Sequence, residues 1–337
     1  MSGSHDTREG LARFLGECWA QDVEVSEFRT ASAGARRRNL LFDATRAGGE
    51  CVPLVATIIP NAAIQVMPME VEAANLRAAE SVGAPAPHLV GVSDDPSYVG
   101  GPFFVTGRVE GESIPRRVLR MVGEHDGLGA RIAAQCGDAL ARIHRVDAAG
   151  VHPKLPRQEE PVAMALTAAR QLLDGLLQPS PTFSLALRWL ERNRPAEPDR
   201  LTLVHGDFRN GNLIVGEDGL RAVLDWEVAH IGDPMEDPGW LCQRMWRFRN
   251  DALEVGGLGR REDLRAGYEA GGGSFDEARF VWWKIMSTLK WGAGLAGQAA
   301  AHLDGTVASI VMAASGRRIA EMEYDLLMLL GPAGASG

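Results

Sequence analysis

Oxygen-bearing side chains recur at short spacing in the segment HGDFRNGN, residues 205–212. Asp207 is followed five residues later by Asn212, and Asp225 stands at the end of the next apolar run. The intervening EDG predicts a tight turn, and a hairpin of this kind would hold the three side chains close together. Carboxylate and amide oxygens are good ligands for Mg²⁺, and a carboxylate that faces a hydroxyl group can accept its proton. The chemistry that this set favours is phosphoryl transfer.

Each member of the set has a role in such a transfer. Asp207 would orient and deprotonate a hydroxyl acceptor, and Asn212 and Asp225 would hold Mg²⁺. Arg209 would neutralise the charge that develops on the γ-phosphoryl oxygens. Taken singly, these residue types are common in turns and helix caps. The ordered set H-x-D-x-x-x-x-N, turn, apolar run, Asp is more specific, because the kinase catalytic signature has the same order.

The composition narrows the class of protein. The chain of 337 residues exceeds one ordinary domain, and its 45% apolar and 23% charged residues are typical of a folded globular protein. A formal net charge of -9 argues against capture of nucleic acid through its phosphates. The four scattered cysteines form no C-x-x-C pair, and no export signal or long apolar run is present. We therefore expect a cytoplasmic protein that does not enter a membrane; the sequence gives no indication of its oligomeric state.

The secondary structure predicted around these residues changes along the chain, from mainly strands to mainly helices. Apolar periodicity predicts a helix over residues 8–20, and short apolar runs separated by turns predict an antiparallel sheet between Val23 and Ile59. A second helix is expected over residues 69–82, and a strand over Tyr98–Val109.

Helical patterns dominate after Gly111, at residues 128–145, 161–177, 183–193, 276–303 and 306–330, interrupted by the strands around HGDF and the hairpin after it. This order predicts an α+β chain with a small antiparallel-sheet lobe at residues 1–107 and a larger helical lobe at 108–337, the second carrying the catalytic set.

Three segments carry a resemblance to a known family. They are VHGDFRNGNLIV, VLDWEVAHIGDPMEDPGWL and, upstream, GGPFFVTGRVEGE. They resemble the aminoglycoside phosphotransferase-like family of small-molecule kinases, of the choline kinase type, and in particular its branch of domains fused to acyl-CoA dehydrogenases. The resemblance covers roughly residues 25–300. It implies a protein-kinase-like fold of two lobes, with the nucleotide, ATP or GTP, bound between them.

The resemblance also implies roles for individual residues. It makes Asp207 the base, Asn212 and Asp225 the metal ligands, and the backbone of Thr106, Gly107, Arg108 and Val109 the hinge that receives the base of the nucleotide. We interpret His205 as a brace of the catalytic loop. Three further residues that match the family are expected to be structural: His144, Asp233 and Asp237.

One position departs from the family pattern. Thr57 stands where a strand lysine or arginine would pair with nucleotide phosphates and with a helix glutamate, here Glu72. An arginine of the preceding loop, Arg36, Arg37 or Arg38, would replace the missing charge; alternatively these arginines form a solvated strand edge. Two other outcomes stay open. In one, Mg²⁺ supplies most of the positive charge at the phosphates, and Glu72 is free for another role. In the other, the protein binds its ligand and catalyses weakly or not at all.

The sequence indicates least about the acceptor, the compound that would receive the phosphoryl group. Five of the eight tryptophans fall between Trp240 and Trp291, where they would either line an acceptor pocket or fill a helical core. An antibiotic, a sugar, a choline-like alcohol or a hydroxyacyl compound would each suit the same catalytic set. We expect a nucleotide and a small hydroxyl compound as the ligands.

Overall fold

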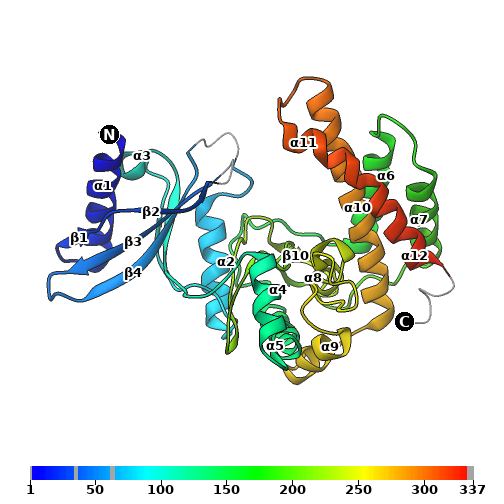
Figure 1. Ribbon diagram of the computed structural model, residues 1–337, viewed down its shortest axis with the longest axis horizontal. Coiled ribbons are helices and arrows are strands. Elements are labelled where there is room, and N and C mark those ends of the chain that lie inside the picture. The colour runs from blue at the N-terminus through cyan, green and yellow to red at the C-terminus, as the bar shows by residue number, and fades with distance from the viewer. Residues whose placement is uncertain (1, 34–36, 61–64, 332–337) are drawn as a thin grey trace.

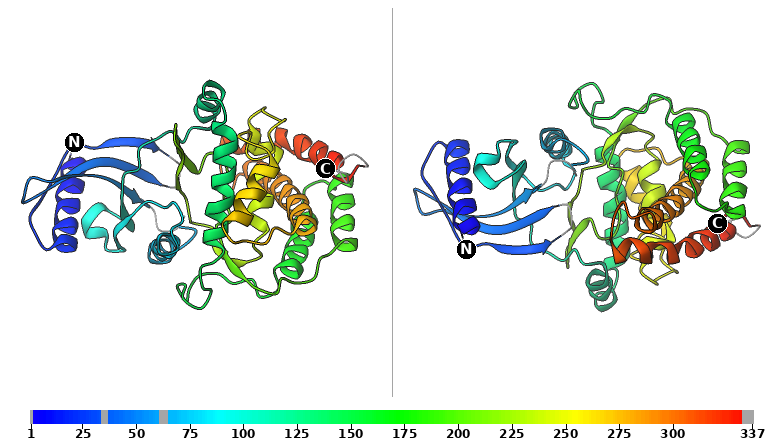
Figure 2. Two further views of the ribbon diagram at one scale, coloured as in Figure 1. Left: turned by 90° about the horizontal axis from the view of Figure 1, so that it is seen from below. Right: turned by 90° about the horizontal axis from the view of Figure 1, so that it is seen from above.

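The protein is built from an antiparallel sheet in its N-terminal part and a larger helical remainder (Figure 1). The computed structural model describes residues 2–33, 37–60 and 65–331, and the side chains of residues 6–30 and of all described residues from 37 onward. The two ends of the described chain lie at opposite ends of the molecule (Figure 2). The predicted α+β fold with a sheet lobe and a helical lobe is confirmed.

The N-terminal sheet has six strands, all paired antiparallel. Five follow the order β1-β3-β4-β6-β5, and β2 pairs with the same edge of β3 as β1 does. The longest pair, β3 with β4, places Asn39 opposite Thr57. The strands are β1 Val23–Val25, β2 Arg29–Ala33, β3 Arg38–Arg46, β4 Cys51–Ile58, β5 Leu89–Ser93 and β6 Phe103–Gly107.

Helices cover both faces of this sheet. From α1 (Ser2–Trp19), Phe14 packs edge to face on Phe103 and shares a core with Val105. Phe104, between those two, points to the other face and joins the core of α2 (Met69–Ser81) and the helical lobe. Alternate residues of β6 thus serve two cores, as the period of a strand requires. Because the second core continues into the helical lobe, α2 is packed against both parts of the molecule.

The predicted strand over Tyr98–Val109 is wrong in its first part. Tyr98 lies in a short helix, α3 (Pro96–Val99), which Asp95 caps by accepting a hydrogen bond from the backbone N–H of Ser97. Gly100 ends this helix in the left-handed region with φ of 86°, and β6 begins only at Phe103. Aspartate followed by proline at the first helical position is a helix start.

The helical lobe contains the predicted long helices and several that the sequence did not indicate. The expected helix over 306–330 is wrong as one element, because Ser309 caps a separate short helix and Gly316 opens a 3₁₀ turn. The sequence did not indicate α4 and α9, which are short and rich in charged residues; α4 buries only Val118. The helices are α4 Pro115–Glu124, α5 Leu128–Ile143, α6 Pro161–Asp174, α7 Pro181–Arg192, α8 Glu236–Leu241, α9 Arg261–Ala270, α10 Glu277–Leu303, α11 Ile310–Ser315 and α12 Ile319–Leu330.

Four short strands carry the segment with the candidate catalytic residues. The predicted hairpin is confirmed as β8 (Leu213–Gly216) paired with β9 (Gly219–Val223). The second pair, β7 (Thr202–Val204) with β10 (His230–Gly232), brackets the loop before β8 and the segment after β9. β6 ends at Gly107, and we keep 1–107 and 108–337 as proposed limits of the two lobes. Within the described ranges, no helix is long and apolar enough to cross a membrane.

Helices α5 and α9 cross at unusually short distance because glycines face each other there. A Cβ atom on Gly267 would lie 1.9 Å from the carbonyl oxygen of Ala134, and one on Gly137 would lie 2.0 Å from that of Leu264. Both distances are far below van der Waals contact with backbone atoms, which cannot move aside as a flexible side chain can. The crossing therefore depends on the absence of side chains at these two positions.

We expect Gly267→Ala to lower the free energy of unfolding by about 2 kcal/mol or more, since overpacking must separate the two helices. Gly294→Ala in α10 is the matched control, because its Cβ would meet no atom within 4 Å. Urea unfolding of both variants gives the comparison. An equal or greater stability of Gly267→Ala would contradict the close crossing.

Candidate active site

The loop from His205 to Asn212 connects β7 to β8 and is held by its backbone. The N–H groups of His205 and Gly206 donate to the two carboxylate oxygens of Asp237, at 2.8 and 2.9 Å. Gly206 has φ of 80°, and a Cβ there would lie 2.7 Å from the carbonyl oxygen of Val228. Glycine is therefore required at this position for both its conformation and its close contact. The loop is anchored before any functional side chain is placed.

Asp237 is fully buried, yet it stays ionised. Burial raises its pKa, but hydrogen bonds from His144 and from the backbone of His205 outweigh this effect and lower the pKa overall. His144 is in turn hydrogen-bonded to the hydroxyl group of Tyr268 at 2.8 Å. This buried chain of contacts joins α5, α9 and α8 to the loop. Asp237 acts on the backbone rather than on a ligand, in keeping with the structural role expected of it.

His205 links the loop to the segment that follows β9. Its Nε2 lies 3.0 Å from the carbonyl oxygen of Leu224, and its Nδ1 accepts from the backbone N–H of Asp207. Burial lowers the pKa of His205, so the ring is neutral and has one donor and one acceptor nitrogen, as these two contacts need. The ring therefore fixes the residue next to Asp225 relative to Asp207, which fits the bracing role.

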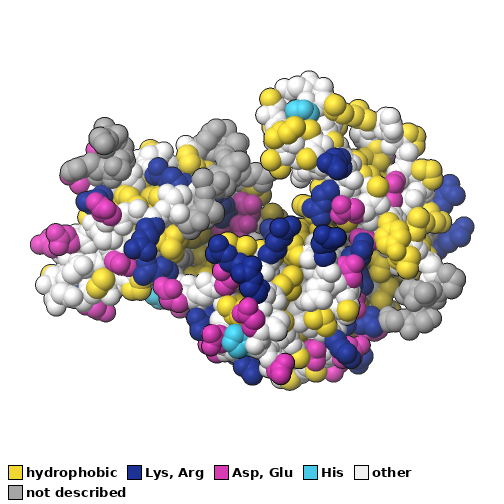
Figure 3. All heavy atoms as spheres, viewed as in Figure 1, with side chains coloured by type: hydrophobic (Ala, Val, Ile, Leu, Met, Phe, Trp, Pro, Cys, Tyr) yellow, Lys and Arg dark blue, Asp and Glu magenta, His cyan; other side chains and the backbone are white. Residues whose placement is uncertain are grey.

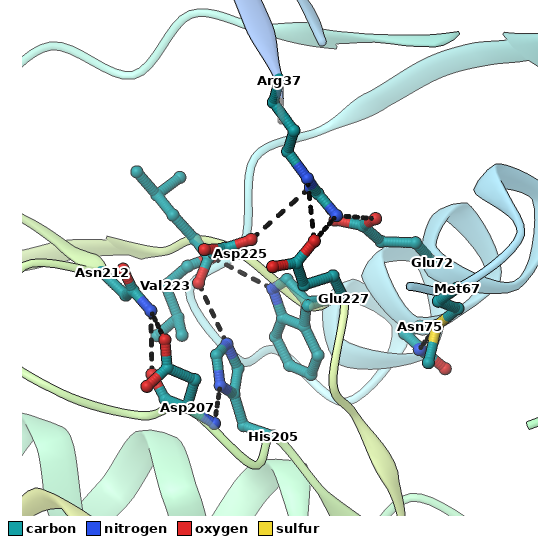
Figure 4. A network of polar contacts seen from close by, with 12 residues as sticks. Arg37, Met67, Glu72, Asn75, His205, Asp207, Asn212, Val223, Asp225 and Glu227 are labelled. Carbon is teal, nitrogen blue, oxygen red and sulfur yellow. Dashed lines mark hydrogen bonds and ion pairs between the residues drawn. The ribbon is translucent and has the colours of Figure 1, made fainter. Parts of the chain in front are cut away.

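The Asp207 carboxylate receives three donor groups (Figure 4 shows the contact from Asn212). Arg209 Nε donates to both oxygens, at 3.0 and 3.1 Å, Trp240 Nε1 donates to Oδ1 at 2.8 Å, and Asn212 Nδ2 donates to Oδ2 at 2.7 Å. Each carboxylate oxygen thus takes two contacts, which is about its full capacity, so the hydroxyl group of an acceptor would have to replace one of them. In this structure Arg209 thus holds the carboxylate. Its action on the transferring phosphoryl group stays a prediction.

Asn212 and Asp225 fit a bound Mg²⁺ ion. Asn212 uses its amide nitrogen on Asp207, and no described residue donates to its Oδ1. Oδ1 of Asp225 is buried without a hydrogen-bond partner among the described residues, and Asp225 has φ of 66°. A non-glycine residue in this region is strained, which is common at functional sites.

Charge around Asp225 also favours a cation. Burial raises its pKa to about 6; the Arg37 guanidinium lowers it, and the carboxylates of Glu227, Glu72 and Asp207 raise it further. The described residues contain no group of three or more His, Cys, Asp or Glu side chains that could hold a metal ion. One carboxylate and one amide oxygen are nevertheless an ordinary protein contribution to Mg²⁺, which completes its shell with phosphate oxygens and water.

Arg37 joins the two lobes through three carboxylates (Figure 4). It forms a bidentate ion pair with Glu72 of α2, with both N–O distances at 2.8 Å. From the other lobe, Glu227 lies 2.7 Å from Nη2 and Asp225 lies 3.5 Å from Nη1. Glu72 is only 1% exposed and Arg37 14%, so the pair is largely shielded from water.

Thr57 is the position where the sequence departs from the family pattern, and the three arginines at residues 36–38 are the candidates for the missing charge. Thr57 is buried, stands one residue before the end of β4, and carries no charge. Arg36, the other arginine expected near the nucleotide, lies outside the described residues. Arg38 begins β3 and forms no ion pair with any described residue. Burial lowers the pKa of Arg37, but the hydrogen bond to Glu72 outweighs it, so the guanidinium stays charged. Arg37 thus pairs with the glutamate that lacks its usual strand partner.

The predicted hinge follows the end of β6. The backbone N–H groups of Gly107 and Arg108 donate to the carbonyl oxygens of His88 and Pro53, at 2.8 and 3.0 Å. Thr106 is buried in the strand, paired with Val55 of β4. No described residue accepts a hydrogen bond from the backbone N–H of Val109. Of the four hinge residues, Val109 is the one whose amide is available to a nucleotide base.

Of the five tryptophans between Trp240 and Trp291, two fill the helical core and three lie beside the catalytic loop. Trp282 and Trp283 are 1% exposed and fill the core of α10. Trp240, Trp246 and Trp291 instead form a triangle with ring centroids 5.5 to 5.6 Å apart, beside the catalytic loop. Arg209 lies over the ring of Trp246, 4.7 Å from its centroid.

Two contributors to the site escaped sequence reasoning. Glu227 follows Asp225 by two residues, which puts both carboxylates within reach of Arg37. Trp240 donates to Asp207 from α8, and no pattern in the sequence indicates that its indole N–H would meet that carboxylate. Spacing could have indicated Glu227; only the tertiary structure reveals Trp240.

Comparison with known proteins adds three findings. The sequence profile of the phosphotransferase enzyme family matches residues 27–278. Acyl-CoA dehydrogenase family member 10 of Mus musculus is 29% identical over 177 residues, which are 50% of this chain and 16% of that protein. Acyl-CoA dehydrogenase family member 11 of Gallus gallus is 29% identical over 188 residues, 53% of this chain and 23% of that protein. The matched segment thus spans less than a quarter of the length of these relatives.

Two solved structures illustrate the likeness of fold. A choline/ethanolamine kinase family protein from Mesorhizobium loti has a TM-score of 0.61 at 19% identity, covering 92% of this chain and 90% of that one. A thermostable mutant of the aminoglycoside phosphotransferase APH(4)-Ia, in ternary complex with AMP-PNP and hygromycin B, has a TM-score of 0.61 at 17% identity, covering 94% and 98%. At such identities the likeness concerns the fold alone.

We expect Arg37→Met to lower the free energy of unfolding by about 3 kcal/mol, because it leaves the buried Glu72 carboxylate unpaired. The double variant Arg37→Met/Glu72→Met should recover at least half of that loss. Arg38→Met is the control and should change stability little. Denaturant titrations of the four proteins measure these effects; a double variant less stable than Arg37→Met would contradict the assigned coupling.

Proposed function

We propose, from the premise that this chain belongs to the phosphotransferase enzyme family, that it moves the γ-phosphoryl group of ATP or GTP to a hydroxyl group of a small molecule. One observation carries the proposal: Asn212 Nδ2 bonds the Asp207 carboxylate at 2.7 Å, while its own Oδ1 accepts no hydrogen bond from a described residue and the buried Oδ1 of Asp225 has only the ion-pair contact with Arg37 at 3.5 Å among the described residues. This arrangement supports Asp207 as the base and Asn212 and Asp225 as the metal ligands.

Asp207 acts as the base in this proposal. It accepts the proton of the acceptor hydroxyl group as the acceptor oxygen bonds to the γ-phosphorus. The bond from that phosphorus to the β,γ-bridging oxygen breaks, and the nucleoside diphosphate leaves with the electron pair. Hydrogen bonds from Trp240, Arg209 and Asn212 hold the carboxylate in one orientation, so it is preorganised for the reaction.

Asn212 and Asp225 would hold the metal ion. Mg²⁺, when bound, would neutralise charge on the phosphate oxygens and hold them in line for transfer. Three carboxylates, Glu72, Asp225 and Glu227, surround the single guanidinium of Arg37. This excess of negative charge favours a divalent cation at the same place.

Arg37 supplies the cation that β4 lacks. Its contact with Glu72 is the one that a strand lysine or arginine makes in kinases, and a guanidinium offers further donors to phosphate oxygens. A second candidate function rests on the same residue: because three carboxylates already engage Arg37 and Thr57 is neutral, the protein would bind nucleotide without efficient transfer. The two functions differ in turnover and not in nucleotide affinity.

The ligands, the nucleotide hinge and the cellular location complete the proposal. The APH(4)-Ia complex holds AMP-PNP together with hygromycin B, which supports a nucleotide and a small acceptor as ligands here. The hinge of Thr106 to Val109 would receive the base through the amide of Val109. All four cysteines are free thiols, which supports a cytoplasmic location.

We expect Asp207→Asn to lower kcat by roughly 10²–10⁴-fold, the usual contribution of a general base, with unchanged nucleotide affinity. The acceptor for this assay comes from a mass-shift screen of hydroxylated metabolites with Mg-ATP and Mg-GTP. Asp218→Asn, in the exposed turn of the β8–β9 hairpin, is the control for folding and charge. Full activity of Asp207→Asn would exclude Asp207 as the base.

Single-turnover transfer from Mg-ATP separates the roles of the loop arginines. Arg37→Ala should slow transfer by at least ~10-fold through loss of a charge near the phosphates, whereas Arg38→Ala should have little effect. Arg36→Ala completes the series. Unchanged turnover in all three variants would leave the replacement of the strand cation without support.

A further inference from the structure

A large cavity lies next to the tryptophan triangle in the helical lobe. Its volume is about 750 Å³, within the range of small-molecule sites, and its walls come from α4, the segment 244–251 and the region of η3 (Gly316–Arg318) and α12. Lys and Arg side chains gather over α4 and, across from it, below α11 (Figure 3). Four arginines line it: Arg116, Arg244, Arg249 and Arg318.

The charge of this cavity is opposite to that of the chain. The whole protein carries a formal net charge of -9, yet the cavity has four arginines against three carboxylates. Two of the arginines are already paired: Arg244 contacts Asp251 and Asp325 at 2.7 and 3.0 Å, and Arg318 contacts Glu321 at 3.4 Å.

The other two arginines have no partner. Arg116 and Arg249 are exposed and form no ion pair or hydrogen bond with any described residue. Unpaired guanidinium groups on two walls of one cavity are a ready site for carboxylate or phosphate oxygens.

Backbone conformation fixes Arg249 at this place. Phe248 and Arg249 both have positive φ, 48° and 77°, in direct succession. Neither is a glycine, and bulky residues in this region carry strain that the surrounding structure must sustain. The strained turn holds Arg249 at the cavity wall and lets Phe248 line the same cavity.

Trp246 connects the cavity to the base. It lines the cavity, is 6% exposed, and its buried Nε1 has no hydrogen-bond partner among the described residues. The guanidinium of Arg209 lies over its ring and bonds Asp207. Two side chains, Trp246 and then Arg209, thus lie between the wall of the cavity and Asp207, so an acceptor whose anionic group lies in the cavity would have to extend its hydroxyl group past them to reach the carboxylate.

We propose that this cavity binds the acceptor and that the acceptor carries an anionic group, held by Arg116 and Arg249, beside the hydroxyl group that receives the phosphoryl group. The inference rests on the proposed function and adds the charge class of the substrate. Polycationic acceptors such as aminoglycosides are disfavoured, because the two unpaired groups of the cavity repel them. A carboxylate and a phosphate group share the recognition chemistry, and the experiment distinguishes them.

The test uses pairs of compounds that differ in charge and share their hydroxyl groups. These are gluconate, glucose 6-phosphate and glucose, then pantothenate and panthenol, with choline and kanamycin as cations. Each is titrated calorimetrically into the protein saturated with Mg-AMP-PNP, which occupies the nucleotide site and permits no turnover. Each is also offered with Mg-ATP, and phosphorylated product is measured by mass shift.

We expect at least one anionic member to bind at least ~10-fold more tightly than its neutral partner, the carboxylate and phosphate arms identifying the preferred anion. Arg116→Gln and Arg249→Gln should each weaken that binding ~10-fold and leave the neutral partner unaffected. Arg120→Gln is the matched control, since Arg120 is exposed one turn further along α4 and does not line the cavity.

The outcomes separate the two proposals. Anion-selective binding that depends on Arg116 and Arg249, without product from any compound, would support the anionic site and count against the proposed function. Product formed only from neutral or cationic members would support the function and overturn the anionic site. Binding that is equal across charge classes, absent for all compounds, or unaffected in both arginine variants would also overturn it.

Discussion

The ion-pair network of Arg37 is the constraint on which the two-lobed arrangement of this site depends. One guanidinium contacts Glu72 of α2 and, from the helical lobe, Asp225 and Glu227. Removing such charges from water is costly unless each has a partner, and here one cation must serve three carboxylates. The network therefore ties the sheet lobe to the segment after β9, and it leaves an excess of negative charge beside the Oδ1 atoms of Asn212 and Asp225, which accept no hydrogen bond from any described residue.

A second set of contacts makes the helical lobe the rigid side of the site. Asp237 fixes the loop backbone, and His205 ties that loop to the residue before Asp225. Because these contacts are buried and use backbone groups, they hold Asp207, the proposed base, close to Asn212 and Asp225, the proposed metal ligands. The sheet lobe contributes the charged side chains of Arg37 and Glu72, and the proposed hinge at the end of β6.

The sequence allowed much of this to be predicted, and the family resemblance read from its motifs is confirmed. Local spacing placed Asp207, Asn212 and Asp225 on one loop and hairpin because turn chemistry and strand periodicity act over a few residues. Which loop arginine would meet Glu72 was beyond reach, since it depends on how β3 enters the sheet. The donor from Trp240 and the pairing of Arg209 with Asp207 were equally hidden, because both arise from contacts between α8, η2 (Arg244–Arg247) and the loop. The helices α4 and α9 were not predicted for a different reason: they are short and rich in charged residues, and they bury few side chains.

The most direct measurement of the central claim is a crystal structure of the protein with Mg²⁺ and AMP-PNP. The account predicts a metal ion bound by Oδ1 of Asn212 and the carboxylate of Asp225, the terminal phosphate facing Asp207, and the guanidinium of Arg37 between Glu72 and a phosphate oxygen. A nucleotide bound with its metal ion away from Asn212 and Asp225, or with Arg37 turned from both Glu72 and the phosphates, would contradict it.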